Sequence, residues 1–223
     1  STSTSAHHLV CFSHLRWNFV YQRPQHLLRR FMRNFKVYYV EEPMYDSKTD
    51  SLEVSKPAEN LWVVVPHLRE GLREEESISR QKEMLANFFI ENDITQYFFW
   101  YYTPMALSVS DHFNPSLIVY DCMDELSAFK FAPQSLKDRE KELLRKADLV
   151  FTGGYSLYEA KKNRHPDVHA FPSSIDVEHF YKARLYSIDP QDQETIPHPR
   201  IGYFGVIDER MDIALLDGIA AAR

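Results

Sequence analysis

The chain has 223 residues, of which 44% are hydrophobic and 26% are charged, and these are ordinary values for a globular protein. Its formal net charge of −6 provides no overall basic field, which argues against a nucleic-acid-binding protein. No apolar run approaches the roughly 20 residues that a membrane span needs, and residues 1–6 do not resemble a signal peptide. Two cysteines are too few for a disulfide framework, so we expect Cys11 and Cys122 to be reduced core thiols of a cytoplasmic protein.

Short apolar runs alternate with helical patterns along most of the chain. The runs predict strands at Leu9–Ser13, Val37–Glu41, Leu61–Val65, Tyr97–Tyr102, Leu117–Asp121, Leu149–Thr152 and Val168–Phe171. The helical patterns begin at Pro24, Glu75, Ser135 and Ser156. Ser135 with Asp138, and Ser156 with Glu159, suit capping boxes, whereas the polar segment Asp46–Asn60 is expected to be a loop.

This alternation is typical of an α/β fold. Strands separated by helices of 10 to 15 residues indicate βαβ units, and right-handed crossovers then give a Rossmann-like, doubly wound parallel sheet. The aromatic run Tyr97–Tyr102 is compatible with a stacking platform for bases or sugars, but a central strand buried on both faces is favoured.

The predicted domain organisation has three parts. Residues 1–183 form a complete first domain, and residues 184–199 are polar and proline-containing, as in an inter-domain linker. Residues 200–223 begin a second domain, with a strand at Ile201–Phe204 and a helix from about Asp212. One βα unit cannot form a core, so we expect the chain to be a fragment of a longer protein.

The loop after the first strand is the first candidate site, because ligands of open α/β sheets bind beyond the carboxyl ends of the strands. Residues 1–40 contain six Lys or Arg and no Asp or Glu. Arg16 and Arg23 suit an anionic substrate or a membrane surface, and His14 is either a base or a structural residue. The basic residues of the following helix also fit a merely solvated face; they are Arg29, Arg30 and Arg33.

Two further candidates follow later strands. Asp121 and Asp124 end an apolar strand, where they are able to bind sugar hydroxyls, act as a base, or simply cap a turn. Their D-x-x-D spacing disfavours a metal site. Gly153 and Gly154 leave backbone N–H groups for a phosphate or sugar oxygen, unless they form a plain turn.

The last candidate lies in the second domain. Gly205 precedes Arg210 and a helix start, which is the arrangement of a diphosphate cradle or of an ordinary surface turn.

Taken together, the motifs resemble GT-B glycosyltransferases of the GT4-like group, and among them bacterial enzymes of teichuronic-acid and exopolysaccharide synthesis. The segments that carry the resemblance are Arg23–Leu27, Ile118–Asp124, Ala147–Thr152 with Ser156, Pro172–Asp176 with Phe180, and Ile201–Gly205. The family's Asn-Gly pair is replaced here by Ser173-Ser174.

The resemblance implies two facing Rossmann-like domains and a reaction that transfers a sugar from a UDP- or GDP-linked donor to a saccharide or lipid-linked acceptor. It implies retention of the anomeric configuration, no metal cofactor, and donor residues beyond Arg223, so that this chain alone is expected to be inactive. The implied acceptor-side residues are Ser13, His14, Arg16, Trp17 and Arg23. The implied catalytic residues are Asp121 and Asp124. The implied donor-side residues are Gly153, Gly154, Ser156, Gly205 and Arg210.

Two alternative functions remain open on the sequence. One is a non-catalytic GT-B-like module that assists a partner transferase, which the replacement at Ser173-Ser174 allows. The other is a sugar-nucleotide epimerase of the same architecture. The basic first helix also suggests peripheral contact with the inner face of a membrane.

Overall fold

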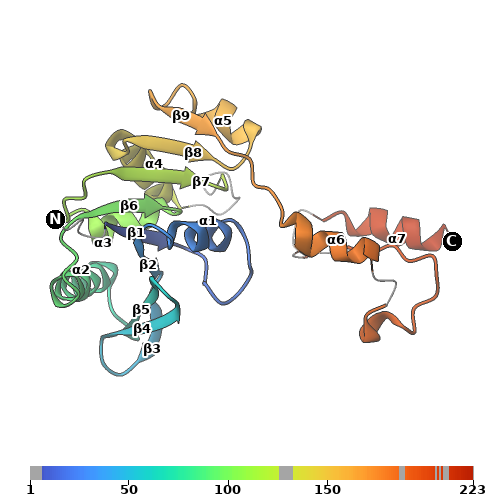
Figure 1. Cartoon of the computed structure of the whole chain (residues 1–223), viewed down its shortest axis with the longest axis horizontal. Coiled ribbons are helices and arrows are strands. Elements are labelled where there is room, and N and C mark those ends of the chain that lie inside the picture. The colour runs from blue at the N-terminus through green and yellow to red at the C-terminus, as the bar shows by residue number, and fades with distance from the viewer. Residues whose placement is uncertain are drawn as a thin grey trace. The chain divides into compact units, whose positions relative to one another are not determined.

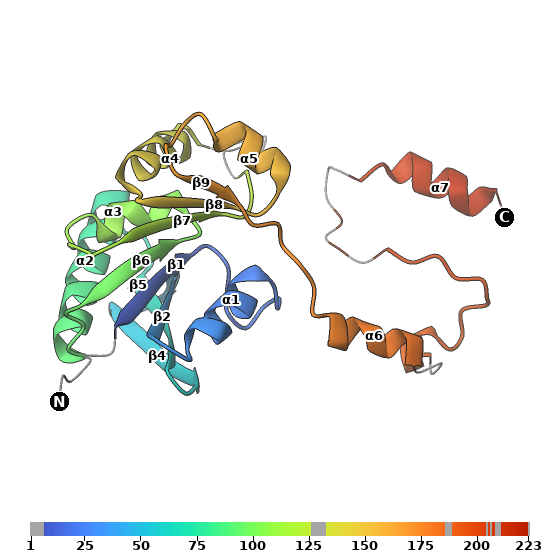
Figure 2. The ribbon, with the colours of Figure 1, turned by 45° about the horizontal axis from the view of Figure 1, so that its top comes forward.

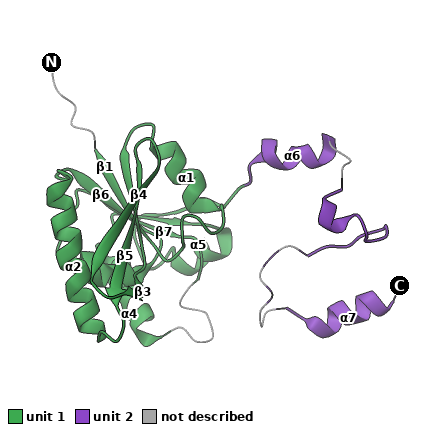
Figure 3. Ribbon diagram, turned by 90° about the horizontal axis from the view of Figure 1, so that it is seen from below, with its two compact units in different colours: residues 1–174 green, residues 175–223 purple. Residues whose placement is uncertain are grey.

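The computed structural model describes residues 7–125, 133–185, 189–203, 205, 207 and 211–222. The chain divides into two compact units, residues 1–174 and 175–223 (Figure 3). The segment expected to be an inter-domain linker, residues 184–199, falls inside the second unit. Each unit is described by itself below.

The first unit is built on one sheet, which the colours of Figure 1 follow from blue to orange. Its strands are β1 (His8–Ser13), β2 (Lys36–Glu41), β3 (Met44–Ser47), β4 (Ser51–Ala58), β5 (Leu61–Arg69), β6 (Tyr97–Tyr101), β7 (Ile118–Cys122), β8 (Leu149–Thr152) and β9 (Val168–Ala170). Hydrogen-bonded neighbours follow the path β3-β5-β2-β1-β6-β7-β8-β9, and β4 pairs with β5 outside this path. Strands β2 and β3 pair with successive parts of β5. Every pair is parallel except β4 with β5, which confirms the Rossmann-like class predicted from the sequence.

Helices cover both faces of this sheet (Figure 2). They are α1 (Arg23–Phe31), α2 (Glu74–Glu91), α3 (Leu107–Ser110) after the 3₁₀ turn Pro104–Ala106, α4 (Gln134–Lys146) and α5 (Tyr155–Lys161). One apolar cluster joins the sheet to α2, α3 and α4, and a second joins the opposite face to α1. Because helices pack on both faces of one mainly parallel sheet, the first unit is doubly wound.

Alternation along the central strands explains the two clusters. In β1, Val10 and Phe12 belong to the cluster under α2, whereas Leu9 and Cys11 face α1. In β6 the aromatic run divides in the same way, because successive side chains of a strand point to opposite faces. The run is therefore core on both faces, and both Cys11 and Cys122 are buried and free.

Three local predictions were wrong. The polar segment 46–60 contains half of β3 and all of β4, which sequence periodicity misses because β4 is almost wholly exposed. Helix α5 begins at Tyr155 with Gly154 as its N-cap, so Ser156 lies in the first turn and forms no capping box. Helix α4 begins one residue before Ser135, with Pro133 as its N-cap and no side-chain cap.

The second unit contains α6 (Val177–Leu185), a 3₁₀ turn at Gln191–Gln193 and α7 (Ile213–Ala221). The side chain of Asp212 caps α7 by accepting a hydrogen bond from the Leu215 N–H at 2.9 Å, close to the predicted helix start. The prediction of a strand at Ile201–Phe204 was wrong, since residues 201–203 form no strand and Phe204 lies outside the described residues. No described residue of this unit is buried. Within the described part of the chain, no helix is both long and apolar enough to cross a bilayer.

Candidate functional site

The candidate site lies at the carboxyl edge of the sheet, beside the point where the strand order reverses. Strand β1 pairs with β2 on one side and with β6 on the other, so the loops after β1 and β6 lie at the reversal of strand order, which is where open α/β sheets bind their ligands. The loops after β7 and β8 follow at the same edge. The structure thus gathers the candidate residues of the first unit along one edge.

The loop between β1 and α1 is held in one conformation by Glu41, a buried carboxylate at the end of β2. Its Oε1 accepts a hydrogen bond from the Trp17 backbone N–H at 2.8 Å, and its Oε2 accepts one from Arg16 Nη1 at 3.0 Å. The same Arg16 nitrogen donates to the Glu42 carbonyl at 2.6 Å. Arg16, with about a third of its side chain exposed, is therefore both an anchor and a charge that solvent reaches.

Further contacts fix the base of this loop. Ser13 Oγ accepts a hydrogen bond from the Leu15 N–H, and the Tyr39 hydroxyl donates to the Leu15 carbonyl at 2.9 Å. Gln25 Nε2 donates to the Trp17 carbonyl at 2.9 Å. Ser13 and Trp17 are both buried, and the Trp17 ring packs on Tyr39, with centroids 5.0 Å apart. These two residues therefore form the buried base of the loop.

Arg23, the first residue of α1, forms a buried pair with Asp121 on β7. Its Nε lies 3.1 and 3.0 Å from the two carboxylate oxygens, and its Nη2 lies 2.9 Å from Oδ1. Only 7% of the Arg23 side chain is exposed and none of the Asp121 side chain. Arg23 Nη1 also donates to the Phe171 carbonyl at 2.6 Å and reaches Ser173 Oγ at 3.5 Å. One guanidinium therefore joins α1, β7 and the segment after β9.

The environment of Asp121 is strongly desolvating. Burial raises the pKa of this carboxyl above its ordinary value, and the hydrogen bonds and charge of Arg23 act in the opposite direction. The Trp100 and Tyr102 polar atoms also lie close enough to lower it, although neither makes a hydrogen bond of standard geometry among the described residues. Asp121 has no exposed surface, and Arg23 provides the counter-charge for its buried carboxylate.

His14 and Asp124 are less buried than Asp121. Burial lowers the pKa of His14, and the charge of Asp124 partly counteracts this. A neutral imidazole at pH 7 follows. Its Nδ1 is buried and has no hydrogen-bond partner among the described residues, while Asp124 is exposed. The two side chains offer one neutral donor or acceptor and one carboxylate, which is the set that binds sugar hydroxyls.

Gly153 and Gly154 connect β8 to α5 at the same edge. A Cβ on Gly153 would lie 3.1 Å from the Met123 Cα and 3.2 Å from its carbonyl oxygen, which is tighter than most Cβ contacts, so glycine favours the close approach of this turn to Met123 after β7. Gly154 has open space around its Cα, and Ser156 is exposed. The Gly153 carbonyl accepts from the Ser173 N–H at 3.1 Å, which fixes the segment after β9 against this turn.

A buried ion cluster that sequence analysis missed lies beside this turn. Lys161 Nζ lies 2.7 Å from both Glu125 Oε1 and Glu140 Oε1, and only 1% of the lysine side chain is exposed. The Tyr120 hydroxyl donates to Glu140 at 3.1 Å, and Arg164 pairs with its other oxygen. Burial lowers the pKa of Lys161, but the two carboxylates outweigh it and raise the pKa overall. The cluster ties α4 and α5 to the residue after Asp124.

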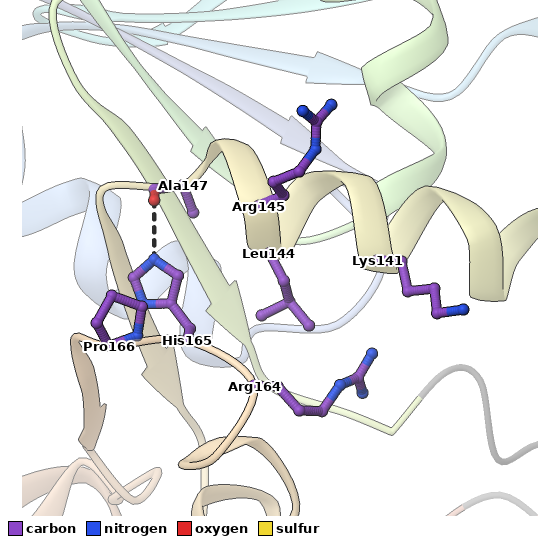
Figure 4. A pocket seen from close by; sticks show the side chains of 7 residues that line it. All are labelled: Lys141, Leu144, Arg145, Ala147, Arg164, His165 and Pro166. Atoms are coloured by element: carbon purple, nitrogen blue, oxygen red, sulfur yellow. Dashed lines mark hydrogen bonds between the residues drawn. The ribbon is translucent and has the colours of Figure 1, made fainter.

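A hollow of about 420 Å³ lies at the opposite edge of the sheet, between the end of α4 and the loop before β9 (Figure 4). It is lined by Lys141, Leu144, Arg145, Ala147, Arg164, His165 and Pro166. His165 Nε2 bonds the Ala147 carbonyl at 2.8 Å, and Arg164 pairs with Glu140. Its most buried polar groups are thus already engaged, and it is remote from the predicted site residues.

The remaining predicted residues belong to the second unit. Arg210 lies outside the described residues. Gly205 is described, and a Cβ there would lie 2.6 Å from the Tyr203 phenolic oxygen. Among the described residues, no three His, Cys, Asp or Glu side chains converge as a metal site requires.

The contacts of several site residues leave no local sequence signal. Glu41, Gln25 and Ser173 bind partners far along the chain or backbone groups, and the members of the Arg23–Asp121 pair are 98 residues apart. The glycine pair after β8 carries such a signal, because glycines between a strand and a helix are visible in any sequence.

The comparisons with known proteins agree with the fold. No protein-family model matches the sequence, and a search of curated proteins gives no match. Among solved structures, one described as trehalose-6-phosphate from E. coli bound with UDP-2-fluoro glucose is similar with a TM-score of 0.55 and 12% identity, over 82% of this chain and 52% of that one. A second, trehalose-6-phosphate synthase OtsA, gives 0.48 and 12%, over 82% and 53%.

The first of these likenesses defines the class of fold. The chain has the Rossmann-like architecture of half of a GT-B enzyme. It spans about half the length of the solved structures that it matches.

Proposed function

We propose that this chain is the acceptor-side half of a nucleotide-sugar glycosyltransferase. In this proposal the intact protein transfers a sugar from a UDP- or GDP-linked donor to a growing cell-envelope or exopolysaccharide acceptor. The observation that carries it is the carboxyl edge at the β1–β6 reversal, where a fixed loop presents His14 near Asp124 on half of a GT-B fold. The GT4-like resemblance of the sequence motifs supports the choice of acceptor.

The roles divide according to exposure. His14, Arg16 and Asp124 retain accessible surface and would contact sugar hydroxyls or an anionic group of the acceptor. Arg23 and Asp121 would hold these residues in place, and Ser13 and Trp17 would support the loop from below. Asp124 is the catalytic candidate that can reach the donor sugar.

The donor side would come from three places. The turn at Gly153 and Gly154 and the exposed Ser156 would face the sugar, and Gly205 with Arg210 would meet the diphosphate. Backbone N–H groups and basic residues stabilise a leaving diphosphate by pre-organised electrostatics, so the proposed reaction needs no metal ion. It would retain the anomeric configuration.

The experiment uses the whole gene product that contains this chain. Release of UDP or GDP is measured over a panel of nucleotide-sugars, with and without oligosaccharide and lipid-linked acceptors. We expect release that depends on the acceptor, and a product whose anomeric proton has the donor's configuration by NMR. Absence of release with every donor and acceptor would contradict the proposal, and release that needs no acceptor would indicate an epimerase or a hydrolase.

Variants test the site itself. His14→Ala should lower kcat/KM at least tenfold, because it removes a polar group from the site, and urea unfolding checks that the variant is still folded. His112→Ala is the matched control, since His112 follows α3 at the opposite edge of the sheet. Equal activities of the two variants would remove His14 from the site.

A further inference from the structure

An exposed apolar tip stands on the loop between β1 and α1. Phe19 is 82% exposed, Val20 47% and Tyr21 54%. Within the described residues of the first unit, this is the one run of three consecutive exposed large hydrophobic side chains. Isolated exposed hydrophobic residues are common on proteins, but a contiguous group on a projecting loop marks a contact surface.

The tip is held outward by the structure beneath it. Trp17 is buried against Tyr39, and the Phe19 N–H donates to the Arg16 carbonyl at 3.3 Å in a tight turn. Arg16 is in turn bound to Glu41. The residues at the base of the loop are thus fixed, while Phe19, Val20 and Tyr21 remain exposed above them.

Basic residues lie next to the tip along α1 and the turn that follows it. Arg29, Arg30 and Arg33 are exposed, and among the described residues none of them forms an ion pair. The Arg29 guanidinium lies 5.5 Å from the Tyr21 ring centroid, so the tip contacts the helix at the first of these arginines. Residues 1–40 carry no Asp or Glu, although the whole chain has a net charge of −6.

We propose that Phe19–Tyr21, together with Arg29, Arg30 and Arg33, is a docking surface for an anionic lipid bilayer. A membrane interface offers acyl chains to hydrophobic side chains and phosphate groups to cations. The exposed hydrophobic tip and the neighbouring arginines, which form no ion pair among the described residues, match these two layers. A soluble polyanion would use the arginines but would leave the phenyl and valyl side chains in water. The combination therefore favours the bilayer.

This docking surface also indicates the kind of acceptor that the protein uses, and this part of the inference rests on the proposed function. The tip belongs to the loop whose base holds His14 and Arg16. A protein docked through the tip would present that edge of the sheet to the membrane surface, so the saccharide acceptor would be one carried on a membrane lipid. Membrane binding and sugar transfer are measured in separate experiments, so a negative result in one does not decide the other.

The test is co-sedimentation of the protein with vesicles of phosphatidylcholine alone and with 30% phosphatidylglycerol. We expect binding to the anionic vesicles, at least a tenfold weaker partition to the neutral ones, and loss of binding in high salt, because exposed charges are screened there. Replacing all three arginines by glutamine should weaken partition at least tenfold, since each basic residue near an anionic surface contributes about fivefold. Phe19→Ser should also weaken it severalfold.

Two matched controls accompany these variants. Lys137, Lys141 and Arg145, exposed on α4, are replaced by glutamine to remove the same charge elsewhere, and Ile90→Ser removes an equally exposed hydrophobic side chain. Both controls should bind vesicles as the unmodified chain does. The proposal is overturned by equal binding to neutral and anionic vesicles, by no binding, or by an unchanged Phe19→Ser variant. Binding of heparin that needs only the arginines would identify a soluble polyanion instead.

Discussion

The protonation of His14 is the property of a single residue that the candidate site depends on most. Burial lowers its pKa, and the nearby Asp124 carboxylate limits the decrease. Asp124→Asn should therefore lower the pKa of His14 further, as measured by an NMR titration of the imidazole protons. Asp138→Asn, on α4, is the control and should leave the titration unchanged. An unchanged His14 pKa in the Asp124 variant would mean that the two side chains are not coupled.

The same shift predicts a pH dependence of stability. A histidine whose pKa is lower in the folded state binds more protons when the chain is unfolded. Its contribution to the free energy of unfolding is therefore complete above about pH 6.5 and is lost as the pH falls through the pKa of the folded state. The free energy of unfolding of the unmodified chain should thus decrease toward pH 5 relative to that of His14→Gln. Urea unfolding at pH 7.5 and pH 5 measures this difference. A constant difference would contradict it.

The buried pair of Arg23 and Asp121 leads to a prediction about stability. Arg23→Met should lower the free energy of unfolding by about 3 to 5 kcal/mol, because it leaves a buried carboxylate without its counter-charge. Arg33→Met, on an exposed position, should change it by no more than about 0.5 kcal/mol. Urea unfolding compares the two. A double variant with Asp121→Leu should recover part of the loss, and a loss equal to the sum of the two single variants would show that the pair is not coupled.

At the scale of elements, the turn between β8 and α5 gives a comparison of two adjacent glycines. Gly153→Ala should destabilise the protein by about 1 to 3 kcal/mol, since its Cβ would press on Met123 backbone atoms that cannot rotate away. Gly154→Ala places a Cβ in open space and should be close to neutral. Thermal unfolding of the two variants tests this. Equal effects would mean that β7 and β8 are free to adjust to each other.

The helices and strands also show which parts of the fold can be predicted from the sequence. Most strands and helices of the first unit follow from periodicity, because their buried faces are continuous, as in Tyr97–Tyr101. The strand Ser51–Ala58 does not, because it is paired along one side and exposed on most of its surface. Pairings between residues distant in the chain, such as Lys161 with Glu125 and Glu140, depend on how helices pack and leave no local pattern.

At the scale of the whole molecule, the buried core lies in the first unit. The described residues of the second unit include no buried side chain. A chain ending at Ser174 should therefore unfold cooperatively in urea, with a free energy of unfolding within about 1 kcal/mol of the 223-residue chain. It retains the contacts of Arg23 with Phe171 and of Gly153 with Ser173. A shortened chain without a cooperative transition would mean that the second unit completes the fold.

The exposed strand β4 has a consequence for how the protein behaves at high concentration. It pairs with β5 on the side opposite β2 and β3, because His67 of β5 is opposite both Met44 and Ser51. Among the described residues no strand pairs with its outer side, which a strand of another molecule could therefore reach. Pro57 lacks the amide hydrogen that such pairing needs, it lies at an irregularity in the register, and Lys56 adds a charge. Both residues oppose pairing of β4 with a strand of another molecule and so disfavour aggregation through this edge of the sheet.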